Sequence, residues 1–274
     1  MQTNTPWIFI QALLPALVIT QLIVVFYFLS DFSSYNTGFS NRASNNFSSP
    51  PDFSSIRKIS VRKESFLRFL SPLIAEENTR ILNTRTRLKT LQANFYDYSK
   101  PYSSEDSIWL TQLANEYSIK TVNTNFKKMT SALLHKIDII PTDLAIAQAA
   151  LESAWGTSRF AQDGNNFFGQ WCFKVGCGIK PTNHKTDRKH YEVKKFNNAG
   201  LSVRSYIKNL NTHPAYKKLR RLRANARLQH GYVTGMSLVS GLRHYSAMGD
   251  AYADSLRNII SHNKLDKILS PTLN

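Results

Sequence analysis

Apolar residues recur at three- and four-residue intervals along three stretches of the chain, a pattern that predicts amphipathic helices. The longest stretch covers Ser65–Leu91, the second covers Ser107–Tyr117 and the third covers Asn125–Ile137. Pro72, inside the first stretch, is expected near a helix start or at a kink, because proline lacks an amide hydrogen. We interpret all three helices as scaffold.

The most apolar stretch beyond the N-terminus predicts a helix that other helices surround. It covers about Asp143–Trp155 in the sequence IDIIPTDLAIAQAALESAWG. Thr142 is placed to cap its amino end and Gly156 to follow its carboxyl end, while an aspartate in the first turn suits the helix dipole. The many alanines imply that neighbouring helices approach closely, so we expect this helix at the centre of the fold.

The N-terminal segment has a different character. Trp7–Leu29 contains no charged residue and is about long enough to cross a bilayer as a helix. The residues before it lack Lys and Arg, which favours an uncleaved membrane anchor over a signal peptide. Residues 30–55 are rich in Ser and Asn and show no helical or strand period, so we interpret them as a flexible tether.

The charge balance narrows the choice of partner. The chain has 35 Lys and Arg against 18 Asp and Glu, a formal net charge of +17. This excess favours a polyanionic partner such as nucleic acid, anionic lipid or an acidic cell-wall polymer, although a solvated basic surface is the simpler alternative. No RRM signature, zinc-finger spacing or basic run with interleaved aromatics is present, so we expect no nucleic-acid partner.

Two cysteines, Cys172 and Cys177, stand in the short stretch WCFKVGC. This spacing favours a local disulfide in an oxidising compartment, with free thiols or metal ligands as alternatives. The seven histidines are scattered, and no second Cys or His pair has ligand spacing, so we expect no metal site. No motif implies an organic cofactor.

One carboxylate interrupts the apolar central helix. Glu152 follows Gln148 by four residues, so both side chains share one face. A carboxylate there either pairs with an Arg or Lys or lines a cleft, where poor solvation raises its pKa and keeps it protonated, as a general acid requires. The stretch GNNFFG, with Asn166 and Phe167, then places amides beside aromatics, a combination that suits sugar binding or, alternatively, a core-packed turn.

LESAWGTSRFA followed by NNFFG resembles a two-part pattern, A-x-x-E-S-x-W-G-x-S-x-x-A and N-N-x-F-G. That pattern belongs to the glucosaminidase domain of bacterial peptidoglycan hydrolases, glycoside hydrolase family 73, and the similarity is greatest to its Bax-type members from Gram-negative bacteria. Two further segments resemble those members, SVRSYIKNLNTHPAYKKLR and GLRHYSAMGDAYADSLRNII. Those members also have a cysteine pair where this chain has Cys172 and Cys177. The similarity covers about Lys63–Lys267.

The resemblance implies a mainly α, lysozyme-like (α+β) fold with a small β-hairpin lobe beside a cleft. The hairpin is expected near Pro181–Phe196. The resemblance and the pattern along the chain together predict four regions. These are an N-terminal transmembrane anchor at 1–29, a linker at 30–60, a helical scaffold at 61–130 and the catalytic domain at 131–270.

The resemblance also implies an activity, that of an endo-β-N-acetylglucosaminidase acting on peptidoglycan without metal or cofactor. Glu152 then protonates the glycosidic oxygen after N-acetylglucosamine. For the second catalytic group Asp187 is preferred slightly over Glu192, and the acetamido oxygen of the substrate is a third choice. The substrate-binding residues are expected to be Gln148, Asn166, Phe167, Gly169, Tyr206 and Tyr245, with Tyr216 and Tyr252 as further cleft-lining candidates.

A peptidoglycan substrate and paired cysteines favour an inner-membrane anchor with the body of the chain in the periplasm. The Lys and Arg residues after the span would instead favour a cytoplasmic body by the positive-inside rule. Two rival functions remain on the same scaffold. A lytic transglycosylase would use the same glutamate but form an anhydromuramyl product, and a wall-binding or morphogenesis protein would be non-catalytic.

Overall fold

The computed structural model describes residues 49–95, 103–120, 125–181 and 191–269. Helices predominate in these ranges and three short strands form an antiparallel sheet, which confirms the prediction of a mainly α fold with a small β lobe. The predicted span Trp7–Leu29 lies outside them, and no helix inside them is long and apolar enough to cross a bilayer. The elements are α2 (Ile59–Asn94), α3 (Ser104–Glu116), α4 (Phe126–Lys136), α5 (Thr142–Ser153), α6 (Arg159–Gly164), β1 (Trp171–Cys172), β2 (Gly178–Ile179), β3 (Glu192–Lys194), α7 (Ala199–Thr212), η1 (Pro214–Tyr216), α8 (Lys217–His230), α9 (Gly235–Leu238), η2 (Val239–Leu242), α10 (Asp250–His262) and α11 (Leu265–Ile268).

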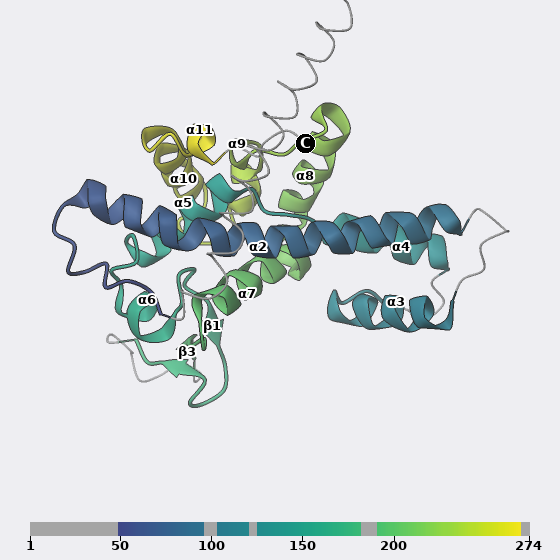
Figure 1. The fold of residues 1–274 in the computed structure, drawn as a ribbon, viewed down its shortest axis with the longest axis horizontal. Helices are drawn as coiled ribbons and strands as arrows, with labels where there is room; N and C mark the ends of the chain where they lie inside the picture. The colour runs from purple at the N-terminus through teal and green to yellow at the C-terminus, as the bar shows by residue number, and fades with distance from the viewer. Residues whose placement is uncertain (1–48, 96–102, 121–124, 182–190, 270–274) are drawn as a thin grey trace, which may run out of the picture. The chain divides into compact units, whose positions relative to one another are not determined.

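The long helix α2 joins the predicted scaffold to the predicted catalytic region. It packs against α4, α5 and α7, and Figure 1 shows α4 alongside its C-terminal half. Its buried apolar residues follow the helical period from Phe66 to Leu91. The helix begins at Ile59 and continues through Pro72, so this proline lies inside it rather than near its start. Within the described residues the two predicted regions therefore share one core.

Helix α5 is central, as its alanine-rich sequence predicts. Every residue from Asp143 to Ala150 is buried, and α2, α9 and α10 pack around it. The predicted cap at its amino end is wrong by one position, because Thr142 is already helical and Pro141 takes the cap position without a side-chain hydrogen bond. The fixed φ of proline suits the entry to a helix, which explains the earlier start.

The chain reverses sharply after α5. Ala154, Trp155 and Gly156 have left-handed backbone conformations in succession, with φ of 50°, 58° and 81°. Positive φ is uncommon for alanine and strained for a residue as bulky as tryptophan. The third position requires glycine for a second reason, since a Cβ there would lie 2.3 Å from the ring of Phe53. This reversal leaves Glu152 in the last turn of the helix.

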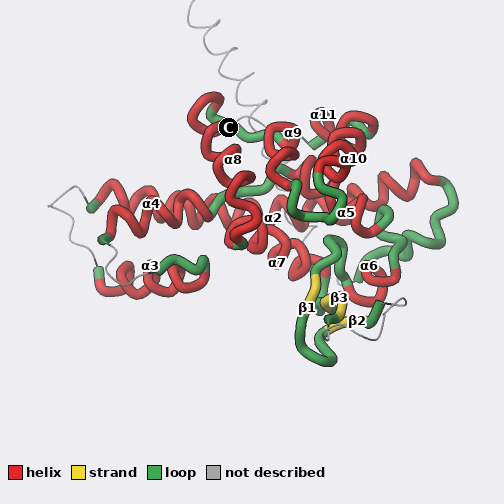
Figure 2. Tube along the Cα trace, turned by 180° about the vertical axis from the view of Figure 1, so that it is seen from behind, coloured by secondary structure: helices red, strands yellow, loops and turns green. Residues whose placement is uncertain are grey.

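The small sheet has the strand order β1-β3-β2, with both pairings antiparallel. Figure 2 shows the three strands gathered beside α6. The hairpin predicted near Pro181–Phe196 is therefore confirmed only for β3, because both of its partner strands come earlier in the chain. Gly178 permits the β2–β3 pairing, since a Cβ there would lie 2.0 Å from the carbonyl oxygen of Val193.

A cluster of buried charges fixes the segment that leads into α5. Asp138 accepts two hydrogen bonds of 2.6 Å from the guanidinium of Arg227 on α8. Arg85 and Arg223 add nitrogen–oxygen distances of 3.5 Å and 3.9 Å to the same carboxylate. Burial alone would raise the pKa of Asp138, but the Arg227 bonds and the three positive charges lower it overall. Helices α2 and α8 are thereby tied to the residues just before α5.

Candidate active site

Glu152 is half-buried in the last turn of α5. Burial raises the pKa of its carboxyl, and a hydrogen bond from Tyr252 opposes this rise only in part. Among the described residues no Lys, Arg or His forms an ion pair with it. Of the two explanations for an acid on this helix, the structural ion pair is thus excluded within the described ranges. A carboxyl that is poorly solvated and lacks a cation favours its protonated form.

A chain of hydrogen bonds supports this carboxyl from three helices. Tyr252 of α10 donates to Oε1 of Glu152 over 2.8 Å. Gln148, one turn earlier on α5, donates through Nε2 to the Tyr252 oxygen over 3.1 Å. Tyr206 of α7 donates in turn to Oε1 of Gln148 over 2.6 Å. All members except Glu152 are buried.

The direction of these bonds determines which oxygen of Glu152 holds the proton. An amide nitrogen can only donate, so the Tyr252 oxygen accepts from Gln148 and its single hydrogen is directed at Oε1 of Glu152. Burial raises the pKa of Tyr206 well above its usual value, so this phenol stays protonated and fixes the amide orientation. Oε1 therefore accepts the hydrogen of Tyr252, and when the acid is protonated we assign its proton to Oε2.

Gly169 lies against the oxygen that carries this proton. Its φ is +62°, and a Cβ at this position would be 3.0 Å from Oε2 of Glu152. Any other residue would combine backbone strain with crowding of the carboxyl. The glycine that ends the NNFFG motif therefore leaves space beside the acidic proton.

The rest of the motif shapes the loop that presents Gly169. Asn166 is buried and donates through Nδ2 to the carbonyl oxygens of Gln170 and Lys194, over 2.9 Å and 2.8 Å. Its Oδ1 accepts from the amides of Phe168 and Gln170, over 3.3 Å and 3.0 Å. One amide side chain thus closes the turn and ties it to β3, far along the chain.

Aromatic rings form the wall behind the hydrogen-bond chain. Phe168 stacks on Tyr206 with ring centroids 3.9 Å apart, and its carbonyl accepts a 2.8 Å hydrogen bond from the hydroxyl of Tyr245. Tyr245 also stacks on Tyr252, at 5.5 Å and 11° between planes. The three tyrosines therefore hold both the acid and the loop opposite it.

The substrate-binding roles expected from the sequence stay predictions, and most of the residues concerned have buried side chains. The side chains of Gln148, Asn166, Phe167 and Tyr206 are buried, so in this conformation they have no surface for a sugar. Phe167 packs between Phe66 and Phe69 of α2. This packing is what we expect if the stretch GNNFFG is a core-packed turn, the alternative to sugar binding. Partial exposure remains at Gly169 and Tyr245. Gln148 and Glu152 share one face of α5, as the sequence predicts. The Gln148 amide is buried and donates a hydrogen bond to Tyr252, the residue that contacts the acid.

Tyr252 is the partner of Glu152 that sequence reasoning ranked too low. The sequence HYSAMGDAY contains both Tyr245 and Tyr252, and the first of them was expected to face the substrate. In the structure the second touches the acid, and the first binds a backbone carbonyl. Helical spacing predicts that Tyr252 lies in the first turn of α10, but it does not indicate which residue Tyr252 faces.

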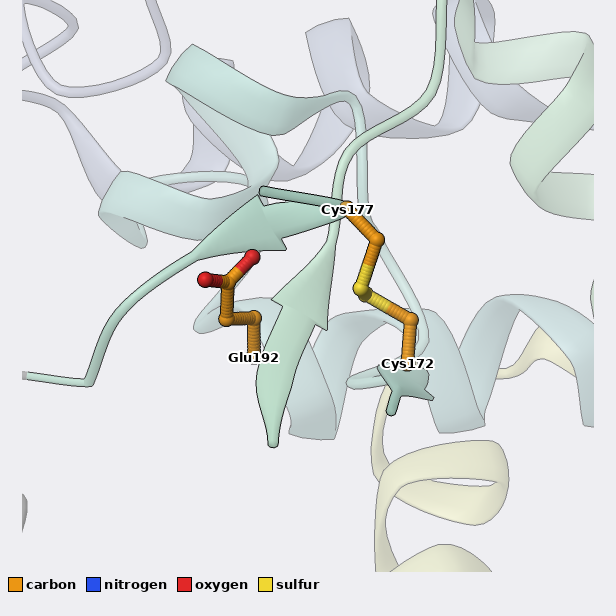
Figure 3. A group of neighbouring side chains, drawn as sticks. All are labelled: Cys172, Cys177 and Glu192. Atoms are coloured by element: carbon orange, nitrogen blue, oxygen red, sulfur yellow. A yellow bond between two sulfur atoms is a disulfide. The ribbon is translucent and has the colours of Figure 1, made fainter. Parts of the chain in front are cut away.

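The disulfide between Cys172 and Cys177 is present, with Cα atoms 6.2 Å apart (Figure 3). Glu192 on β3 lies beside it, and its carboxylate accepts from the amides of Gly176 and Gly178 over 3.2 Å and 2.7 Å. These bonds lower the pKa of Glu192, so it stays ionised and holds the disulfide loop. With both sulfur atoms bonded to each other, this cluster offers no thiolate to a metal ion.

Two expectations at the site remain predictions. Asp187, the preferred second acid, lies outside the described residues. A pocket of about 480 Å³ lies near Trp155 between α2 and the C-terminal segment, and Glu152 is not part of its lining. We assign it no role in the chemistry of Glu152. A cleft at the acid itself is still an expectation from the sequence.

Comparison with known proteins shows which chains this sequence is similar to. The glucosaminidase family model, described as mannosyl-glycoprotein endo-β-N-acetylglucosaminidase, matches residues 127–265. Protein bax of Escherichia coli (strain K12) is 34% identical over 224 residues, which are 82% of this chain and 78% of that protein. The crystal structure of the catalytic domain of the autolysin Auto from Listeria monocytogenes aligns over 65% of this chain and 94% of its own, with 18% identity and a TM-score of 0.35.

Proposed function

Because the chain belongs to the glucosaminidase family, we propose that it is a peptidoglycan hydrolase that cleaves the glycosidic bond after N-acetylglucosamine, with Glu152 as the general acid. The observation that carries the proposal is the half-buried carboxyl of Glu152, which has no cationic partner among the described residues and whose pKa is raised by burial. The lysozyme-like character of the fold, with an acid at a helix end beside a small β lobe, is part of the same proposal.

The first chemical step uses the proton on Oε2. Glu152 transfers it to the glycosidic oxygen, the bond from that oxygen to the anomeric carbon breaks through an oxocarbenium-like state, and the leaving sugar departs as a neutral alcohol. The carboxylate formed on Glu152 keeps the hydrogen bond from Tyr252 at Oε1. The same hydrogen bond therefore serves the neutral acid and its conjugate base, without any movement of the supporting side chains.

The second catalytic group stays a matter of proposal. Glu192 is engaged by two backbone amides of the disulfide loop, which makes it a support of that loop rather than a free base. Asp187 therefore remains the preferred carboxylate from the sequence, and the acetamido oxygen of the substrate remains the alternative.

Peptidoglycan as the substrate is supported by charge and by the cysteines. The net charge of +17 suits a polymer that carries carboxylates, and the disulfide suits an oxidising compartment. With the apolar segment Trp7–Leu29 as an anchor, we place the body of the chain in the periplasm, held at the inner membrane. Protease added to spheroplasts should digest the body, and a protected body would contradict this topology.

Analysis of the reaction products tests the proposed function directly. Purified full-length protein in detergent is incubated with isolated peptidoglycan, and released fragments are examined by mass spectrometry. We expect fragments that end in reducing N-acetylglucosamine. Anhydromuramyl ends would identify a lytic transglycosylase instead, and no release above the blank would favour the non-catalytic alternative.

Substitution of Tyr252 by phenylalanine should shift the pH dependence of this activity. The Tyr252 hydroxyl donates to Glu152 and so lowers the pKa of that carboxyl. Activity requires the protonated acid and falls as pH rises through its pKa, so loss of the hydroxyl should move the alkaline limb of kcat/KM to higher pH. Tyr117→Phe removes a buried phenol just after α3 and is the control, which should leave the limb in place. An unmoved limb in Tyr252→Phe would contradict the hydrogen-bond assignment.

Substitution of Gly169 by alanine should lower activity more than the accompanying strain explains. The added Cβ would press on Oε2 of Glu152 at 3.0 Å, and a small displacement of a catalytic group costs on the order of 10- to 100-fold in rate. Gly231 at the end of α8 is a matched control, because its φ is +76° and nothing lies within 4 Å of a Cβ there. Both variants should lose a similar, small amount of thermal stability. Equal activities of the two would contradict the crowding of the acid.

A further inference from the structure

The turn between β1 and β2, together with Trp171 before it, exposes apolar side chains that the proposed chemistry does not use. We call residues Trp171–Cys177 the disulfide tip. Phe173 is 78% exposed, Val175 is 75% exposed and Trp171 is 49% exposed. Phe173 directly follows β1, and Val175 lies in the turn that is closed by the hydrogen bond from the Cys177 amide to the Lys174 carbonyl. An exposed apolar group of this kind contributes little to folding and is typical of a binding surface.

The disulfide tip is held in one shape. The bond between Cys172 and Cys177 closes it covalently (Figure 3). The carboxylate of Glu192 accepts hydrogen bonds from the amides of Gly176 and Gly178. The ordering cost of these residues is therefore met during folding and does not recur on binding. Because the fixed shape of the tip does not serve to bury its apolar side chains, we expect it to serve the binding of a partner.

The charge around the tip indicates the sign of that partner. Lys174, Lys180 and Lys195 are exposed in and beside it. The nearby acidic group, Glu192, is buried and committed to loop amides. Among the described residues, the surface that surrounds the apolar side chains is thus basic and suits a partner with carboxylates.

The position of the tip relates it to Glu152. Gly169 lies against Oε2 of the acid, and the chain runs from there into β1 and the tip. Phe173 is four positions after Gly169, so their Cα atoms are at most about 14 Å apart even in a fully extended chain. Trp171 lies between them and meets Tyr191 edge-on, with ring centroids 4.8 Å apart. The tip therefore begins close to the glycine that contacts the acid, at a distance that a few sugar residues of a bound strand span.

We propose that the disulfide tip is a second binding surface for the glycan strand, beyond the sugars that are joined at the cleaved bond. Trp171 and Phe173 cover apolar faces of sugar rings, and Lys174 and Lys180 pair with carboxylates that the strand carries. The inference rests on the proposed function for its ligand. Its continuity with Gly169 favours a glycan over a phospholipid surface, which the same apolar and basic groups would otherwise suit.

The test measures binding in a protein that cannot turn over its substrate. The parent is full-length Glu152→Gln in detergent, mixed with insoluble peptidoglycan and sedimented. In this parent, Phe173→Ser with Val175→Ser should raise the half-saturating peptidoglycan concentration about 10-fold, from the lost burial of two apolar side chains. The control is Leu228→Ser on α8, which is 86% exposed and should bind like the parent.

A second arm separates the two classes of partner. The same pair of proteins is sedimented with vesicles of phosphatidylglycerol and phosphatidylethanolamine, and since residues 1–48 are common to both, only the tip can cause a difference. Unchanged binding to peptidoglycan would overturn the proposal, and a loss confined to vesicles would assign the tip to a bilayer. Equal losses on both materials would mark an unspecific apolar contact and would also overturn it. Because the assay measures binding without turnover, its result does not depend on whether the wild type hydrolyses peptidoglycan.

Discussion

Glu152→Gln should lower the turnover number on peptidoglycan by on the order of 10²- to 10⁴-fold, the contribution of a positioned general acid. Glutamine has nearly the same shape, and its side-chain oxygen can still accept the hydrogen bond that Tyr252 donates to Oε1. What the variant lacks is the acidic proton on the second oxygen. The fold should therefore be retained while the first step of bond cleavage is lost.

The measurement is the rate at which reducing ends are released from isolated peptidoglycan, with circular dichroism as the check on folding. Glu116→Gln is a suitable control, because this glutamate pairs with Lys208 at the surface and lies on α3. It should retain the activity of the wild type. Substantial activity in Glu152→Gln would remove the central group from the mechanism, whichever product the enzyme forms.

Asp138→Asn should lower the free energy of unfolding by about 3–5 kcal/mol, the usual effect of removing one partner from a buried ion pair. The loss leaves Arg223, only 1% exposed, without its negative partner and breaks the two-fold hydrogen bonding to Arg227. Arg85 loses the same charge. Since the cluster ties α2 and α8 to the segment before α5, activity should fall together with stability.

The contribution of Asp138 to the free energy of unfolding should depend on pH. The fold lowers the pKa of Asp138, so the cluster stabilises the protein above the pKa of the unfolded aspartate, and this stabilisation is lost as pH falls through the folded value. Thermal unfolding of the full chain at neutral and acidic pH should therefore show a difference between wild type and Asp138→Asn that shrinks in acid. Asp254→Asn breaks an exposed pair with Arg257 and should cost less than about 1 kcal/mol. A similar cost for both variants would contradict the structural role of the cluster.

The sequence predicted the helices well where a single face is apolar, because helical spacing is a local property. The centres of α2 to α5 are as expected, and the differences are at the ends and at Pro72. Helix α2 extends by six residues before Ser65, where Arg62 donates to the carbonyl oxygen of Ile56 and Lys63 donates to the side chain of Asn263. The sheet was less predictable, since β3 pairs with strands on the far side of the undescribed residues 182–190.

The site divides in the same way. Glu152, its helix and the face it shares with Gln148 follow from a four-residue spacing. The disulfide follows from a five-residue separation, a distance short enough for the sequence alone to favour the pair. The roles of the buried amides and aromatics do not follow, because a side chain that suits sugar binding equally suits a hydrogen-bonded core.

By itself, then, the sequence determined the local facts about this protein: an apolar helix, an acid in its last turn, a glycine-ended motif after it and a closed cysteine loop. Only the tertiary structure decided the surroundings of that acid. Tyr206 and Tyr252 reach Gln148 from positions 58 and 104 residues away, and their packing sets both the burial and the proton-bearing oxygen of Glu152. The physical reason is that spacing and turns depend on neighbours in the chain, whereas desolvation and hydrogen-bond direction depend on whatever the fold brings alongside.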